Sequence, residues 1–127
     1  MLDTNIVSEL LNHPRGAVAT RIGRQSSAVS ISVVVAAELR FGAAKKGSAR
    51  LTARVETLLG LIDIEPLAPP ADIVYGDLRA RLEREGQPMD ANDLLIAAHA
   101  LALGRDLITR DKAFSRVDGL TVEDWSR

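Results

Sequence analysis

Apolar and polar positions alternate with two different periods along this chain. Residues 28–35 (AVSISVVV) are rich in β-branched side chains and predict a strand, and residues 62–67 and 106–110 are shorter strand candidates. Between them, apolar residues recur three and four positions apart, which predicts helices over 5–11, 34–46, 48–61, 71–85 and 92–104. Strands that alternate with helices predict an α/β fold with a mainly parallel, twisted sheet flanked by helices.

Two of these helices differ in how much of their surface is apolar. The helix over 48–61 carries Arg50, Arg54 and Glu56 on one side, which predicts a surface helix. The segment 92–104 is apolar almost all round and predicts a buried helix, with Asn92 as its N-cap and Gly104 at its end.

The length of 127 residues predicts one domain over residues 1–127 with a substantial core. Because the chain has no cysteine, it has no disulfide framework, and any metal ion must be held by oxygen or imidazole ligands. No apolar run is long enough to span a membrane, and the first residues lack the order of a secretory signal. We therefore expect a soluble, cytoplasmic protein with no membrane partner.

The net charge of −1 argues against a simple basic nucleic-acid binder. If several of the 17 acidic residues gather at one metal site, however, the rest of the surface keeps a small basic excess, which is compatible with a polyanionic substrate. Aromatic residues make up only 3% of the chain, so a base-stacking platform is poorly supported. The composition favours chemistry on a nucleic-acid backbone over the reading of bases.

Four carboxylates occupy unexpected positions. Asp3 follows the apolar pair Met-Leu, Asp111 follows the strand candidate at 106–110, and Asp93 begins the most apolar helix. Glu38 lies on a face shared with valines and a phenylalanine. Taken singly, each aspartate could be a helix cap or turn residue, and Glu38 could form a salt bridge, for example with Arg40.

Together, the four acids form a pattern that suits metal-dependent chemistry. The carboxyl ends of parallel strands line one crevice, where ligands bind. Clustered carboxylates repel one another unless a cation lies among them, and Mg²⁺ or Mn²⁺ prefers such hard oxygen ligands. One such ion, or two lying roughly 4 Å apart, can activate water and stabilise the leaving oxygen of a phosphodiester.

Four segments, in this order, resemble the PIN-domain nucleases and, among them, the VapC-type toxins of bacterial toxin–antitoxin pairs. They cover nearly the whole chain: LDTNIVSELL, ISVVVAAELRFGA, NDLLIAAHAL and LITRDKAFSRVDGLTVEDW. The resemblance implies a twisted, mainly parallel sheet flanked by helices. It also implies an endoribonuclease that depends on Mg²⁺ or Mn²⁺, cuts transfer or ribosomal RNA, and forms a homodimer or a hetero-oligomer with a cognate antitoxin.

Carried over by position, the catalytic and metal-binding acids of this family fall on Asp3, Glu38, Asp93 and Asp111. Asp111 is expected to assist a second ion or the attacking water rather than anchor the metal. The same resemblance places Asn5 and Ser32 beside the site as supporting polar residues. Only two residues precede Asp3, so we expect a short first strand, or a chain start assigned too late.

Several other polar or aromatic residues lie near these segments and have simpler interpretations. Asp90 is expected to be a loop or cap residue and His99 a packed histidine. Arg110 and Lys112 flank Asp111 and are interpreted as solvated charges, although they could contact phosphates. Trp125 is expected to anchor the packing of the last segment.

Two other functions are compatible with acids at strand ends. A Mg²⁺-binding phospho-acceptor receiver domain has similar length and α/β order, but it requires an adjacent acidic pair near the start and a lysine after a late strand. Asp3 stands alone, and Lys112 follows Asp111 immediately. A non-catalytic PIN-like binding module would keep the acidic pocket only for the basic groups of a partner.

Overall fold

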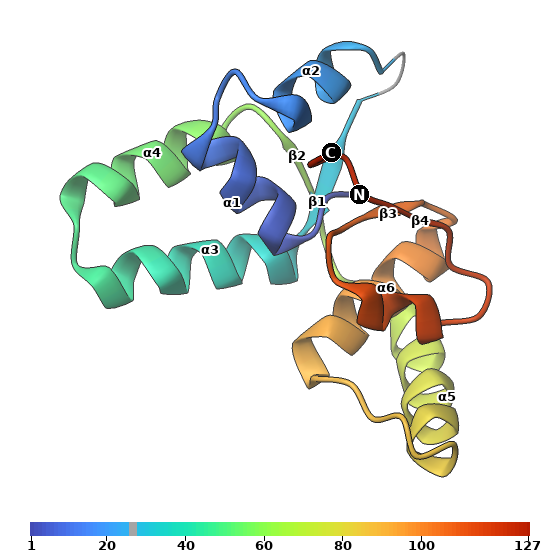
Figure 1. The fold of residues 1–127 in the computed structure, drawn as a ribbon. Coiled ribbons are helices and arrows are strands. Elements are labelled where there is room, and N and C mark those ends of the chain that lie inside the picture. Colours follow the sequence, from blue (N-terminus) through green and yellow to red (C-terminus); the bar gives the residue numbers. More distant parts are fainter. Residues whose placement is uncertain (26–27) are drawn as a thin grey trace.

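The computed structural model describes residues 1–25 and 28–127 (Figure 1). In this part of the chain, β1 (Ser30–Ser32) pairs in parallel with β2 (Asp63–Glu65), and β3 (Leu107–Ile108) pairs in parallel with β4 (Val122–Glu123). The first residues of the chain join the two pairs. The Leu2 amide donates to the Ser30 carbonyl at 2.8 Å, and the Asp3 amide donates to the Ile108 carbonyl at 2.9 Å.

Helices surround these strands. They are α1 (Thr4–Asn12), α2 (Ala17–Gly23), α3 (Val33–Lys46), α4 (Ala49–Leu59), α5 (Ala71–Arg84), α6 (Ala91–Leu103) and the short 3₁₀ helix η1 (Lys112–Arg116). Helices α3 and α4 lie side by side and form an arm that extends away from the strands, while α5 packs against α6 on the other side (Figure 1). The predicted mainly parallel sheet flanked by helices is confirmed.

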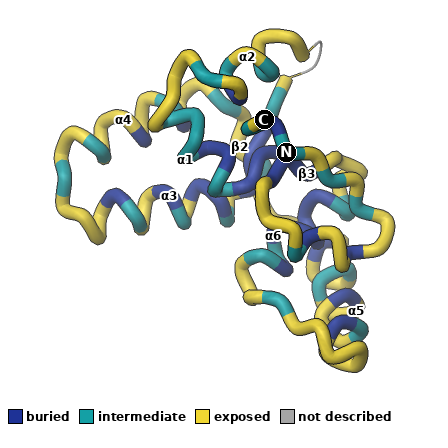
Figure 2. Tube along the Cα trace, in the orientation of Figure 1, coloured by how far each residue is buried: buried dark blue, intermediate teal, exposed yellow. Residues whose placement is uncertain are grey.

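Buried residues concentrate in β1, β3 and α6, whereas β2 and β4 are partly or fully exposed (Figure 2). Ile31 of β1 and Leu107 of β3 are fully buried, as is Leu2, which forms an isolated parallel bridge with Ile108. Phe114 of η1 is fully buried in the same core. Complete burial of one such side chain stabilises the fold by about 1.5–3 kcal/mol. The strand ends that carry the polar residues are therefore held on a packed apolar layer.

The strand predicted over 28–35 is shorter in the structure, because Ser32 ends it. The Ser32 hydroxyl oxygen accepts a hydrogen bond from the Val34 amide at 3.1 Å, and α3 begins at Val33. This N-cap overrides the β propensity of the three following valines. The strand candidates at 62–67 and 106–110 also form, in shortened versions, as β2 and β3.

The buried helix predicted over 92–104 is α6, but its cap was assigned to the wrong residue. Asp90, not Asn92, is the N-cap, and its carboxylate accepts from the Asn92 amide at 3.1 Å. The helix ends at Gly104, whose φ of 66° is left-handed, as a C-terminal glycine predicts. Asp93 thereby becomes the third residue of α6 instead of the first after its cap.

The surface helix predicted over 48–61 is α4, in which only Val55 and Leu59 are buried. Helix α2, η1 and β4 had no counterpart in the sequence prediction. Within the described ranges, no helix combines the length and the apolar character that crossing a membrane requires.

Candidate active site

Asp3 lies where the first residues of the chain leave the sheet, and only 4% of its surface is exposed. It is the N-cap of α1, and its Oδ1 accepts from the Thr4 amide at 2.8 Å. Its Oδ2 accepts from the Thr109 hydroxyl at 2.7 Å. Burial raises the pKa of Asp3, and these two hydrogen bonds offset part of that effect. The cap interpretation is correct, and it coexists with a buried, electrostatically perturbed carboxylate.

Thr109 hydrogen-bonds to residues near the start of the chain and to a residue near its end. Besides donating to Asp3, its hydroxyl oxygen accepts from the Asn5 side chain at 3.2 Å and from the Asp111 amide at 3.0 Å. Thr109 is buried directly after β3. Sequence analysis missed this residue, although its place between the strand candidate and Asp111 was a usable signal.

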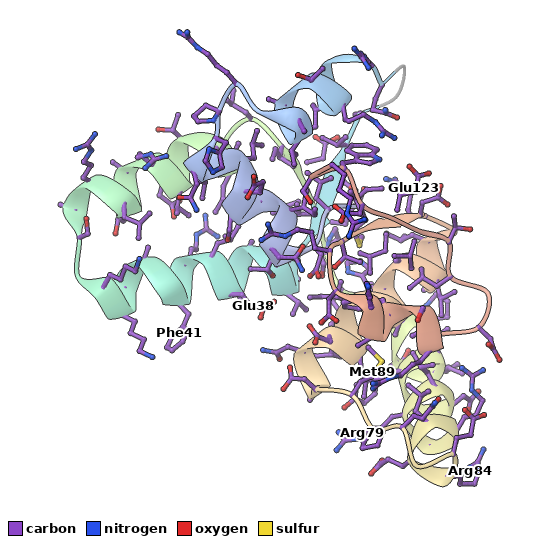
Figure 3. All side chains as sticks on the ribbon, in the orientation of Figure 1. Glu38, Phe41, Arg79, Arg84, Met89 and Glu123 are labelled. Atoms are coloured by element: carbon purple, nitrogen blue, oxygen red, sulfur yellow. The ribbon has the colours of Figure 1, made fainter. Side chains whose placement is uncertain are left out.

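Glu38 lies on α3, close to the end of that helix that meets the sheet (Figure 3). Its Oε1 accepts a hydrogen bond from the Thr4 hydroxyl at 2.8 Å. Burial raises its pKa; the Thr4 bond opposes this change, and the charges of Asp3 and Asp90 add to it. The considered salt bridge with Arg40 is absent, because Arg40 instead binds Glu56 through two hydrogen bonds of 2.9 Å.

Asp93 carries a strongly perturbed carboxylate. Burial raises its pKa to about 6, and the negative charges of four other acids contribute further: Asp3, Asp90, Asp111 and Glu38. Each of these charges acts on Asp93 because the acids lie near one another in space. The four acids predicted from sequence are therefore neighbours, although 108 positions separate the first from the last.

Two exposed acids, Asp111 and Asp90, lie at helix starts beside the cluster. Asp111 is the N-cap of η1, and its Oδ1 accepts from the Ala113 amide at 2.9 Å. Asp90 caps α6 as described, which confirms its interpretation as a cap residue. Its charge nevertheless raises the pKa of both Glu38 and Asp93, so it is a fifth acid at the edge of the cluster.

The two supporting polar residues take different positions. The Asn5 side chain donates to Asp3 at 3.3 Å and to Thr109, and its oxygen accepts from the Arg110 amide at 3.2 Å. Ser32 is fully buried and bonded to the Val34 amide and to His99. In the part of the chain that the structure describes, no hydrogen bond joins Ser32 to an acid of the cluster.

The remaining candidates behave as structural or surface groups. His99 is buried within α6, and Trp125 is a packing residue whose indole N–H donates to Glu123 at 2.9 Å. Arg110 pairs with Glu9 at 3.3 Å. Lys112 is exposed beside Asp111.

The donor chemistry of this cluster fits a hard divalent cation. Carboxylate oxygens are the preferred ligands of Mg²⁺ and Mn²⁺. Burial raises the pKa of Asp3, Glu38 and Asp93, and neighbouring acids raise it further, so a bound cation would favour their charged forms. Across the described residues, however, no three acidic or histidine side chains are arranged as a ready-made metal-binding group. The acids therefore lie near one another, but their side chains do not form a complete set of metal ligands.

Comparison with known proteins gives a consistent result over the whole chain. The model of the PIN domain matches residues 1–120. Ribonuclease VapC2 of Rickettsia felis is 34% identical over 100% of this chain and 98% of its own length. The tRNA(fMet)-specific endonuclease VapC of Shigella flexneri is 35% identical over 99% of this chain and 97% of its own length.

A solved structure agrees with these relatives. The VapBC2 complex of Rickettsia felis, bound to a DNA fragment from its promoter, contains a chain that superimposes with a TM-score of 0.91 at 31% identity. The match covers 98% of this chain and 97% of that chain.

Proposed function

The chain belongs to the PIN-domain family, and on that basis we propose that it is a metal-dependent endoribonuclease, the toxin of a toxin–antitoxin pair. The observation that carries this proposal is the convergence of Asp3, Glu38, Asp93 and Asp111. Thr4 hydrogen-bonds to both Asp3 and Glu38, Thr109 hydrogen-bonds to Asp3 and to the Asp111 amide, and the charges of the other three acids help to raise the pKa of Asp93. Perturbed carboxylates that lie together at strand and helix ends are typical of a catalytic site.

The substrate follows from the relatives. Two curated relatives that match this chain over nearly their full length are named as a ribonuclease and as an endonuclease specific for tRNA(fMet). We propose that this chain cuts a structured RNA, with transfer RNA as the first candidate and ribosomal RNA as the second. Its reaction is hydrolysis of a phosphodiester bond inside the RNA chain.

In the proposed mechanism, Asp3, Glu38 and Asp93 hold one Mg²⁺ or Mn²⁺, and Asp111 helps to hold a second ion or to orient the attacking water. When bound, such ions lower the pKa of water and neutralise charge that develops on the phosphate. The Thr109 hydroxyl and the Asn5 amide orient Asp3, and the Thr4 hydroxyl orients Glu38. These hydrogen bonds fix two acids before any ion binds, as an efficient site requires.

The partners are an RNA substrate and a cognate antitoxin. Related structures are toxin–antitoxin complexes in which a chain of this fold is held with its antitoxin. We propose that this chain is likewise inhibited by a VapB-type protein and that it forms homodimers within a larger complex. We propose the cytoplasm as its location, because an RNA target and an antitoxin of this kind would be met there.

The decisive experiment is cleavage of total RNA by antitoxin-free protein in Mg²⁺, Mn²⁺ or EDTA. We expect discrete products that require the metal ion and are lost in Asp93→Asn. The matched control is Asp77→Asn, which changes an exposed aspartate on the neighbouring helix α5 and should cut like the wild type.

Three results would contradict the proposal: products in EDTA, equal products from Asp93→Asn, or no products with any divalent ion. The last result, combined with tight binding of a basic partner, would favour the non-catalytic binding module instead.

A further inference from the structure

A polar pair inside the core joins the start of α3 to α6. The Ser32 hydroxyl and Nδ1 of His99 share a hydrogen bond of 2.8 Å. Ser32 is 0% exposed and His99 is 1% exposed. Neither side chain is hydrogen-bonded to an acid of the cluster within residues 1–25 and 28–127, so the proposed mechanism does not use them.

Each member of the pair lies six residues from one of the acids along the same helix. Ser32 is the N-cap of α3, and Glu38 follows it by six residues on that helix. His99 follows Asp93 by six residues on α6. At a helical rise of 1.5 Å per residue, each acid lies about 9 Å along its helix from the hydrogen bond. A movement of one helix against the other at this bond therefore changes the separation of Glu38 and Asp93.

The surroundings of His99 on α6 explain why a directional contact matters there. The neighbouring buried residues of this helix are mostly small, namely Ala97, Ala98 and Ala100. Small side chains make few interlocking contacts with a neighbouring helix, so they fix its position only weakly. A hydrogen bond has a preferred length and direction, so it defines one arrangement of the two helices.

The location of the Ser32 hydroxyl strengthens this connection. Its oxygen also accepts from the Val34 amide, so the same atom ends β1, begins α3 and contacts α6. Burial lowers the pKa of His99, and the nearby Pro66 backbone and Glu65 carboxylate oppose only part of that effect. A neutral imidazole avoids the cost of a buried charge at this position.

We propose that His99 and Ser32 are positioning residues whose hydrogen bond fixes α3 against α6 and thereby sets the separation of Glu38 and Asp93. This inference rests on the proposed function, because the separation matters for catalysis only if these acids act together. It also changes the role expected for Ser32, which was that of a polar residue beside the site. The hydroxyl acts through His99 and the α3 N-cap, not on RNA or metal.

The first test compares two substitutions of the histidine in the RNA cleavage assay. Asn places a polar atom close to the position of Nδ1 and keeps a hydrogen bond with Ser32, whereas Leu removes it. We expect His99→Leu to lower kcat roughly 10- to 100-fold, as small displacements in active sites do, with KM for RNA unchanged. His99→Asn should restore most of kcat.

The control for a merely structural role is Leu82→Ala, which empties a fully buried position on α5. This variant should lose stability but keep the kcat of its folded fraction. The proposal is wrong if His99→Leu loses stability and keeps its kcat in the same way, or if His99→Asn fails to restore kcat while remaining folded.

A second measurement does not depend on activity. The chain has no cysteine, so spin labels can be attached specifically at Ala44→Cys on α3 and Leu103→Cys on α6. Pulsed electron paramagnetic resonance then measures the distance between the two labels. We expect a broadened or shifted distance distribution in His99→Leu and in Ser32→Ala, and a wild-type distribution in His99→Asn. The two disruptive changes should be non-additive when combined, as residues that share one bond are.

These results separate the two proposals. If the wild type does not cut RNA but His99→Leu changes the distance distribution, the proposed function fails and the pair still sets the arrangement of the helices. If RNA is cut and the distribution is unchanged in both disruptive variants, the positioning inference fails alone.

Discussion

Replacing Asp93 with asparagine should stabilise the metal-free protein at neutral pH while abolishing its activity. In the folded chain, burial and the neighbouring acids raise the pKa of Asp93 to about 6 from an ordinary value of 3.8. Unfolding releases the carboxylate into water, where it ionises more easily. The ionised Asp93 therefore disfavours the folded state, and a neutral amide of the same shape removes that cost.

The magnitude follows from linkage between protonation and folding. At about 1.36 kcal/mol per pKa unit, this difference corresponds to about 3 kcal/mol, and the partial exposure of Asp93 reduces the expected gain to about 1–3 kcal/mol. Between pH values of about 4 and 6 the folded state holds a proton that the unfolded state has lost, so wild-type stability falls as pH rises through this window. Below it, both states of Asp93 are protonated and the gain vanishes.

The assay is urea unfolding in EDTA at about pH 7.5 and again at about pH 4, with linear extrapolation of the free energy of unfolding. The expected gain for Asp93→Asn raises the melting temperature by roughly 5–10 °C at the higher pH. Asp77→Asn should change the free energy of unfolding by less than about 0.5 kcal/mol at either pH. Equal or lower stability of Asp93→Asn at the higher pH would refute the argument that burial and the neighbouring acids make the ionised Asp93 unfavourable in the folded state.

A divalent cation should reverse this order of stability. An ion that binds only the folded state at about 1,000 times its Kd stabilises that state by about 4.1 kcal/mol, which is more than the gain of about 1–3 kcal/mol expected for Asp93→Asn in EDTA. Wild-type protein should gain this stability in Mn²⁺, whereas Asp93→Asn should gain little. The same substitution would then be stabilising in EDTA and destabilising, relative to wild type, in Mn²⁺.

Three further substitutions test the description of the fold and the site. Thr109→Val keeps the shape of the side chain but removes the hydroxyl that joins Asp3, Asn5 and the Asp111 amide, so urea unfolding should show a loss of about 1–3 kcal/mol and the cleavage assay a lower kcat. Phe114→Ala empties a fully buried site in η1 and should cost about 3–5 kcal/mol in the same unfolding assay. Gly104→Ala places a side chain at a φ of 66° with no heavy atom within 4 Å of the new Cβ, so it should cost about 1–2 kcal/mol through backbone strain alone and leave kcat unchanged.

The acid cluster was predictable from sequence because its members are charged residues at positions where the pattern calls for apolar ones. A charged residue on an apolar helix face or directly after an apolar strand needs a reason, and Glu38, Asp93, Asp3 and Asp111 all share this property. Their proximity could not be derived from spacing, because it depends on the pairing of the Asp3 amide with the Ile108 carbonyl. Strand pairing across the length of a chain leaves no local signal.

The residues that orient the acids were harder to predict. Thr4 and Thr109 are ordinary polar residues beside predicted strands, and their hydroxyls become relevant only when tertiary contacts bring them to Glu38 and Asp3. The α6 cap was missed for a local reason, because Asp90 and Asn92 are both good N-cap residues two positions apart. The strand at 28–35 was overextended because a single serine cap outweighs the strand preference of the valines that follow it.

The position of Leu2 and Asp3 between β1 and β3 has a consequence for how the protein is made. A ribosome synthesises these residues early, yet the Thr109 partner of Asp3 lies 106 positions further along. A nascent or truncated chain that ends before this segment has neither the hydroxyl that holds Asp3 nor the fourth acid. The translation machinery, which handles the proposed RNA targets, is therefore not exposed to a complete acid cluster until synthesis has passed Asp111.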